Sequence, residues 1–218
     1  MNMESRIERK FTVGKYNKDF FEKFLKFHSF HKPYADREVS SVYFDTYNYD
    51  FLRANIDGIG IRKKIRIRWY NNDFKTFSLE EKIKNNFLVS KKIKKINFLF
   101  SENKFKESLK QYYKSEKDKS FKESNFQIVL KTNYKRSYWL SSDKKIRATI
   151  DTNLVTSPYN YLDRVVNLPE TILEFKYLPK YENYFRNFYK NIKSGLRVVK
   201  YSKYVKSFFE LNNSGLIN

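Results

Sequence analysis

Four basic side chains alternate along the segment 61–70, which reads Ile-Arg-Lys-Lys-Ile-Arg-Ile-Arg-Trp-Tyr. Successive side chains of a β-strand point to opposite faces, so a strand here has one apolar face and one cationic face. The cationic face carries Arg62, Lys64, Arg66 and Arg68. Arginine binds phosphate through paired hydrogen bonds, and lysine adds a point charge. The row therefore indicates either a sheet face in water or a surface that binds phosphates.

The same pattern recurs in other segments with a period of two. One face carries charges of both signs, and the opposite face is apolar and often aromatic. The charged faces hold Arg6, Glu8 and Lys10; Glu80 and Lys82; Arg147 and Asp151; Glu174 and Lys176. Carboxylates among cations are the oxygen donors that a hard divalent cation needs. Most aromatic residues fall on the apolar faces, which argues against base-stacking platforms for nucleic acid.

The composition limits the classes of molecule that this protein is expected to bind. The chain has 218 residues, a net charge of +21 and no cysteine. This charge attracts polyanions, namely nucleic acid, anionic lipid, polyphosphate or nucleotides. The chain has no apolar stretch long enough to span a membrane, and residues 1–9 contain no signal-like apolar run. We therefore expect a cytoplasmic protein without a membrane span.

The periodicity predicts a mainly β protein of the α+β class. Helices are expected at 17–29, 101–114 and 181–192, with Ser101 as a cap and Gly195 as a stop. A short helix or turn is expected at 48–57, another short helix after 204, and a charged connection at 115–123. Strands are expected at 6–11, 38–46, 61–70, 77–83, 88–96, 146–151 and 171–177, with one long strand or a strand pair at 126–140, and residues 198–204 are expected to lead into the last helix.

The helices indicate which way the charged faces point. Three amphipathic helices need an apolar surface to cover, so the apolar strand faces are expected outside and the charged faces inside. A closed antiparallel β-barrel of eight strands, with helices packed outside, meets that demand and leaves room for one ligand. So many charges cannot be buried unpaired, so the lumen is expected to hold a polyanion with its metal ion. No repeat or second domain is evident, and residues 1–218 are expected to form one domain.

Seven short motifs in order carry a resemblance to a known family. They are Arg6-x-Glu8-x-Lys10, Ser41-Val-Tyr-Phe-Asp45-Thr46, Arg66-x-Arg68-Trp-Tyr, Leu79-Glu80-x-Lys82, Thr149-Ile-Asp151, Leu173-Glu174-x-Lys176 and Ser202-Lys203-Tyr204. Together they resemble the vacuolar transporter chaperone (VTC) catalytic domain. That domain is a polyphosphate polymerase of the triphosphate tunnel metalloenzyme (CYTH-like) superfamily. The resemblance covers nearly the whole chain.

The resemblance implies a role for individual residues. Arg66, Arg68 and Lys203 would act in catalysis, and Glu174 would bind Mn²⁺ or Mg²⁺ with help from Glu8. The phosphate-binding set would be Lys10, Arg66, Arg68, Lys82, Lys91, Lys92, Arg136, Arg147, Lys176, Lys200, Ser202 and Lys203. The sequence departs from the hydrolytic tunnel enzymes at one position of the first strand. Those enzymes resemble one another in a Glu-x-Glu-x-Lys motif there. Arg6 takes the first of these Glu positions here.

Three functions follow from this reading. The first is a polyphosphate polymerase that uses ATP or another nucleoside triphosphate. The second is a metal-dependent triphosphate hydrolase, which the Arg6 substitution disfavours. The third is a module that binds polyphosphate or nucleic acid without catalysis. We expect inorganic polyphosphate or triphosphate, rather than nucleic acid, as the partner, and the sequence does not indicate an oligomeric state.

Overall fold

A ten-stranded, antiparallel sheet dominates the computed structural model, which describes residues 6–13, 18–86, 88–96, 104–115, 126–190 and 197–217. Eight strands follow one another in the order β1-β10-β8-β7-β3-β4-β5-β6, while β2 pairs with β7 and β9 pairs with β8. The strands are β1 (Ile7–Val13), β2 (Phe30–His31), β3 (Arg37–Thr46), β4 (Ile61–Tyr70), β5 (Phe77–Asn85), β6 (Leu88–Ile96), β7 (Phe126–Ser141), β8 (Ile146–Pro158), β9 (Val166–Leu168) and β10 (Thr171–Tyr177).

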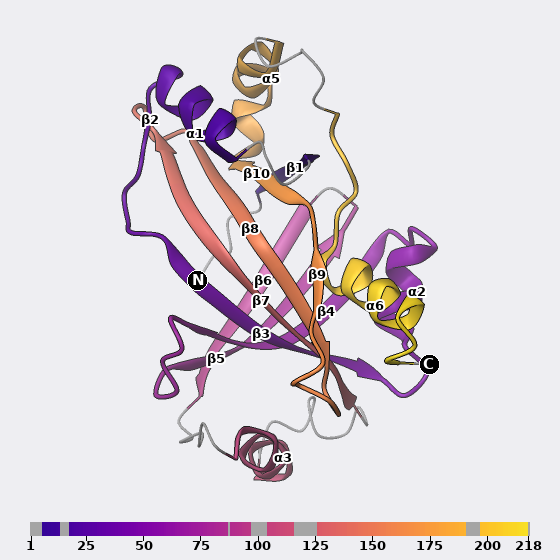
Figure 1. Cartoon of the computed structure of the whole chain (residues 1–218). Coiled ribbons are helices and arrows are strands. Elements are labelled where there is room, and N and C mark those ends of the chain that lie inside the picture. Colours follow the sequence, from indigo (N-terminus) through magenta and orange to yellow (C-terminus); the bar gives the residue numbers. More distant parts are fainter. Residues whose placement is uncertain are drawn as a thin grey trace.

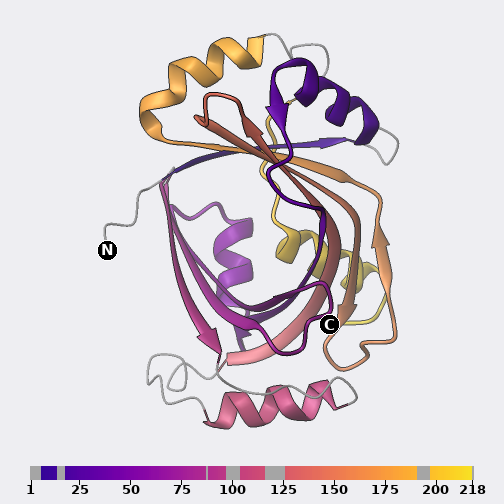
Figure 2. The ribbon, with the colours of Figure 1, turned by 90° about the vertical axis from the view of Figure 1, so that its left-hand side faces the viewer.

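The helices lie around this curved sheet (Figures 1 and 2). α1 and α5 lie together beyond one end of the sheet, α3 lies at the opposite end, and α2 and α6 lie side by side. The helices are α1 (Lys18–Phe27), α2 (Asp50–Ile56), α3 (Phe105–Ser115), the 3₁₀ turn η2 (Pro179–Tyr181), α5 (Glu182–Lys190) and α6 (Lys203–Asn213). Among the described residues, no helix combines the length and apolarity that crossing a membrane requires.

The apolar strand faces form the core on the outside of the curve, as the alternation predicts. Ile65, Ile67 and Trp69 of β4 pack with Phe105 and Leu109 of α3. A second cluster joins β1, β8 and β10 to α1 and α5. Burial of these side chains drives α1, α3 and α5 onto the outer face at roughly 25 cal/mol per Å² of apolar surface, whereas α2 and α6 pack against Tyr43 and Leu130. The charged faces are therefore left on the concave side.

The sheet is an open half-barrel, so the prediction of a closed barrel is wrong. Between β1 and β6, no backbone pairing occurs among the described residues, although both strands are edges of the eight-strand path. The seam between the two edges is bridged by side chains, because Lys82 Nζ of β5 lies 2.8 Å from Glu8 Oε2 of β1. The alternation of apolar and charged residues shows which side chains share a face of the sheet. It does not determine whether the two edge strands pair with each other.

Asp45 links β3 to the two helices that lie side by side. Its carboxylate accepts hydrogen bonds from the backbone amides of Phe51 and Leu52 at the start of α2. It also accepts a hydrogen bond of 2.6 Å from the Tyr204 hydroxyl of α6. Burial raises the pKa of Asp45. This motif residue therefore positions the N-terminus of α6, and with it Lys203, relative to the sheet.

Residues 198–204 lead into the C-terminal helix, as expected, without forming a continuous strand. Only an isolated bridge between Phe11 and Val198 forms there, and α6 begins at Lys203. Ser202 caps this helix by accepting a hydrogen bond from the Val205 amide. The short helix expected after residue 204 is therefore confirmed, but it starts earlier. The expectations for Ser101, 115–123 and Gly195 fall mainly or wholly outside the described residues.

Candidate active site

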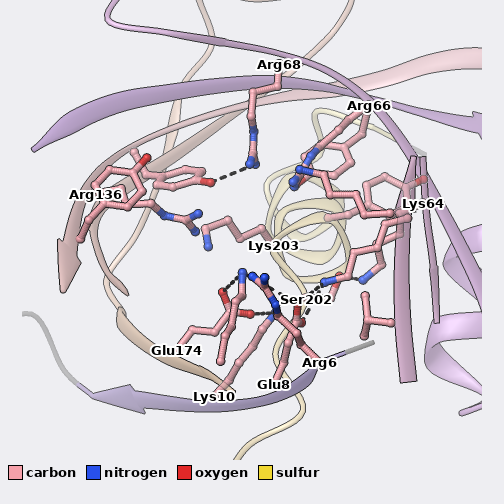
Figure 3. Close-up of a pocket in the computed structure, with 18 of the residues that line it drawn as sticks. Arg6, Glu8, Lys10, Lys64, Arg66, Arg68, Arg136, Glu174, Ser202 and Lys203 are labelled. Atoms are coloured by element: carbon pink, nitrogen blue, oxygen red, sulfur yellow. Dashed lines mark hydrogen bonds and ion pairs between the residues drawn. The ribbon is translucent and has the colours of Figure 1, made fainter. Parts of the chain in front are cut away.

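The concave side of the half-barrel holds a cavity of about 550 Å³. Among the described residues, ten basic side chains and two carboxylates line it. The lining comprises Arg6, Glu8, Lys10, Tyr43, Lys64, Arg66, Arg68, Tyr70, Lys82, Val89, Lys91, Tyr134, Arg136, Tyr138, Glu174, Lys176, Ser202, Lys203 and Tyr204. Figure 3 shows Arg68, Arg66 and Lys64 along one wall and Glu174, Lys10, Glu8 and Arg6 along the facing wall. The prediction that the cationic face of 61–70 points inward is confirmed.

Glu80 holds the two arginines of β4 in place. It is 3% exposed, and its Oε2 atom lies 2.6 Å from Arg66 Nη2 and 3.7 Å from Arg68 Nη1. Its Oε1 atom lies 2.6 Å from Lys91 Nζ. Burial opposes ionisation of this carboxyl, but the charges of Arg66, Arg68 and Lys91 outweigh it and lower the pKa. Glu80 therefore stays ionised and orients three cations toward the cavity.

Asp151 has the same role on the neighbouring wall. Arg136 donates two hydrogen bonds to it, at 2.6 and 2.7 Å, and Lys203 donates a third from the start of α6. Asp151 is 1% exposed. Burial opposes its ionisation, but Arg136 and Lys203 lower the pKa of the carboxyl. A paired guanidinium and an ammonium are thus held where the helix N-terminus also favours an anion.

Lys64 is the exception among the lysines of this wall. It donates a 2.7 Å hydrogen bond to the Ser202 hydroxyl, and none of the described carboxylates lies within ion-pair distance of it. Burial, reinforced by the charges of Lys10, Lys82 and Arg66, lowers the pKa of Lys64 well below its ordinary value. An anionic ligand would supply the counter-charge that this side chain lacks.

Glu8 and Glu174 lie on adjacent strands at the facing wall. Glu174 Oε2 lies 3.0 Å from Lys176 Nζ, and Glu174 Oε1 lies 3.6 Å from Lys10 Nζ. Glu8 Oε1 accepts a hydrogen bond of 2.9 Å from Lys82 Nζ. The described residues contain no group of three or more His, Cys, Asp or Glu side chains that could hold a metal ion. Mg²⁺ is commonly bound by only one or two carboxylates together with substrate phosphates and water. These two residues therefore fit a divalent cation that shares its coordination with a triphosphate.

Three residues of the predicted phosphate-binding set do not line the cavity. Lys92 is exposed and pairs in register with outward-facing Glu81, because its neighbour Lys91 takes the inward position on β6. Arg147 lies opposite Lys176 in the sheet but is exposed near the strand end. Lys200 is exposed beside Gly58. The remaining predicted residues line the cavity: Lys10, Arg66, Arg68, Lys82, Lys91, Arg136, Lys176, Ser202, Lys203, Glu8 and Glu174.

Comparison with known proteins identifies the family. The VTC domain family matches residues 1–211. The chain belongs to the VTC domain family. The family resemblance inferred from the ordered motifs is therefore confirmed. A search of curated protein sequences finds no match.

Two solved structures are similar to this VTC domain. An adenylyl cyclase candidate from Hippeastrum, described as having a dominant triphosphatase activity, superposes with a TM-score of 0.56. The two chains are 11% identical, over 99% of this chain and 98% of that one. An adenylate cyclase candidate from Vibrio parahaemolyticus gives a TM-score of 0.48 at 13% identity, over 86% and 84% of the two chains. At 11% identity, the likeness to the Hippeastrum structure concerns the fold alone.

Five tyrosines of the VTC domain cavity were missed by the sequence reading. They are Tyr43, Tyr70, Tyr134, Tyr138 and Tyr204. A signal existed for three of them, because Tyr70 alternates with Arg66 and Arg68, and Tyr134 and Tyr138 alternate with Arg136. The Tyr134 ring makes a cation–π contact with Lys203, whose Nζ atom lies 4.4 Å from the ring centroid. The cavity therefore combines cations with aromatic rings.

The pH dependence of triphosphate binding should follow the protonation of two lysines in this VTC domain cavity. Burial lowers the pKa of Lys82 and of Lys91 to about 8, despite the facing carboxylates Glu8 and Glu80. Both ammonium groups are charged below that pH and lose their charge above it, so tripolyphosphate affinity should fall between pH 7 and pH 9. Titration calorimetry of wild type and Lys91→Arg tests this, because arginine keeps its charge and should make the fall shallower. An unchanged pH profile in the variant would contradict the assignment.

Proposed function

We propose that this VTC domain is a metal-dependent polyphosphate polymerase. It transfers the terminal phosphoryl group of a nucleoside triphosphate, with ATP as the expected donor, to a growing polyphosphate chain. The observation that carries the proposal is the convergence of ten cationic side chains and two adjacent carboxylates in one cavity. Family membership and the fold support the broader class, a triphosphate tunnel enzyme. One sheet supplies both walls, so in this proposal residues 1–218 act as one domain.

The proposed transfer needs no covalent intermediate on the protein. A terminal phosphate oxygen of the acceptor chain forms a bond to the γ-phosphorus, and the bond from that phosphorus to the β,γ-bridging oxygen breaks. The nucleoside diphosphate leaves with the bonding electron pair. Negative charge is spread over the transferred group, and in this proposal Arg66, Arg68 and Lys203, which line the cavity, stabilise it by electrostatics. Arg136 and Lys10 orient the neighbouring phosphates.

A divalent cation would be held by Glu174 with Glu8. When bound, Mn²⁺ or Mg²⁺ would neutralise charge on the phosphate oxygens. In the structure, Lys176 Nζ lies 3.0 Å from Glu174 Oε2 and 3.8 Å from Glu8 Oε1. Lys176 is therefore placed to move from the carboxylates to the phosphates as the metal complex binds.

Hydrolysis of triphosphate is the second candidate, and the activity described for the Hippeastrum protein favours it. The position of Arg6 argues for the polymerase. Arg6 lines the cavity beside Glu8, where a hydrolytic relative would be expected to present a further carboxylate. A guanidinium there adds affinity for a second phosphate chain and cannot activate water as a base.

The deciding experiment is incubation of the protein with ATP and Mn²⁺, followed by separation of the phosphorus products. We expect long polyphosphate and ADP from the wild type. Glu174→Gln should lose this turnover because it removes a metal ligand. It should still bind tripolyphosphate in EDTA, because the basic side chains of the cavity remain. Glu182→Gln is the matched control, since Glu182 pairs with Arg9 outside the cavity and should leave turnover unchanged. Orthophosphate alone would identify a hydrolase, and binding without any product would identify a binding module.

A further inference from the structure

An arginine and three tyrosines gather at the end of the cavity where β3 begins and β4 ends. The carbon at the centre of the Arg37 guanidinium lies 5.6 Å from the Tyr34 ring, 5.9 Å from Tyr70 and 5.8 Å from Tyr138. The Tyr34 and Tyr138 rings are 6.0 Å apart and meet edge to face. We call these four residues the aromatic mouth.

The aromatic mouth adjoins the proposed phosphate site. Tyr70 and Tyr138 line the same cavity as the cations. Tyr138 lies two residues from Arg136 on one strand face, about 7 Å along the strand. Arg37 lies directly opposite Arg136 in the register of β3 and β7. A ligand whose phosphates lie on Arg136 would therefore extend its next group between these rings.

The chemistry of the mouth differs from that of the cavity interior. The interior cations are mostly held by carboxylates, whereas Arg37 makes no ion pair among the described residues and is exposed. Tyr34 is 59% exposed, so a flat group can approach its ring from solvent. Tyrosine rings and a guanidinium plane bind flat π-systems by stacking, and they do so for any base.

We infer that the aromatic mouth binds the nucleobase of the phosphoryl donor, and so makes a nucleotide rather than inorganic triphosphate the preferred donor. This inference rests on the proposed function, because it assumes that the triphosphate lies on the cations of the cavity. A polyphosphate chain would gain nothing from the rings. A nucleobase gains stacking on Tyr138, Tyr70 and Tyr34, and Arg37 can move from these three rings onto the face of the base.

The test compares two ligands that share a triphosphate but differ in the base. Affinities for ATP and for tripolyphosphate are measured by titration calorimetry in EDTA for wild type, Tyr34→Ala and Tyr138→Ala. Each ring removal should weaken ATP about fivefold to a hundredfold, the range that base–aromatic stacking contributes per base. Tripolyphosphate affinity should change less than twofold. Tyr138→Phe keeps the ring and should behave as wild type, as should Tyr161→Ala, which removes an exposed ring stacked on Arg164 elsewhere.

The outcomes separate this inference from the proposed function. Equal losses for ATP and tripolyphosphate, or no loss for either, would overturn the nucleobase site while leaving the triphosphate site intact. Failure of the wild type to bind tripolyphosphate would overturn the proposed function first, and the inference with it. Thermal unfolding of each variant shows whether a loss comes from the fold, and Tyr34→Ala keeps the test decisive because its exposed ring is not part of the core.

Discussion

Replacing Glu80 by Gln should lower the free energy of unfolding by about 3 kcal/mol in the absence of ligand. Removing one partner of a buried ion pair typically costs 3–5 kcal/mol, because the remaining charge is left without compensation. Arg66, Arg68 and Lys91 all lose their carboxylate in this variant. We expect the lower end of the range, since Arg66 and Lys91 keep access to the water of the cavity. Urea denaturation measures the change.

Glu81→Gln is the matched control for that experiment. Glu81 is the next residue on β5, faces the opposite side of the sheet and pairs with Lys63 near the surface. Such partly exposed pairs contribute about 0–1 kcal/mol. The two variants therefore remove the same charge from opposite faces of one strand. A Glu80→Gln variant as stable as Glu81→Gln would show that the cavity cations do not depend on Glu80.

The faces of the strands were predictable from sequence, but the closure of the sheet was not. The alternation in 61–70 places Ile65 and Ile67 in the core and Arg66 and Arg68 in the cavity, as observed. Whether β1 meets β6 depends on twist and curvature summed over eight strands, which no local pattern records. The start of the C-terminal helix was expected after residue 204, whereas Ser202 caps a helix that begins at Lys203.

The site was predictable where strand alternation or an ordered motif identified a residue. Lys91 and Lys92 are adjacent, so sequence alone could not decide which one faces inward, and the register with Lys82 puts Lys91 there. Arg147 and Lys200 carry the right charge, but they lie at strand and loop ends beyond the cavity. The aromatic mouth was not predictable, because Tyr34, Tyr70 and Tyr138 come from three separate segments that only the folded sheet brings together.

Lys64 is repelled by neighbouring cations in the empty site. Arg66 and Arg68 carry the same charge, but Glu80 compensates them, so their loss would destabilise the ligand-free fold. Lys64 is buried among Lys10, Lys82 and Arg66 without a carboxylate partner in the described part of the chain. Lys64→Gln should therefore leave the ligand-free protein as stable as wild type or more so, because an uncompensated buried charge is removed. Its affinity for triphosphate should fall about tenfold, the loss of one charged hydrogen bond.

Thermodynamic stabilisation by tripolyphosphate, measured in parallel on wild type, Lys64→Gln and Lys63→Gln, tests the triphosphate site most directly. At a hundredfold excess over the wild-type dissociation constant, a ligand that binds only the folded state stabilises it by ~2.7 kcal/mol. The same concentration should stabilise Lys64→Gln by only ~1.4 kcal/mol, which corresponds to tenfold weaker binding. Lys63→Gln, which removes the neighbouring outward-facing lysine, should keep the full ~2.7 kcal/mol. Equal stabilisation of all three proteins would contradict the placement of triphosphate in this cavity.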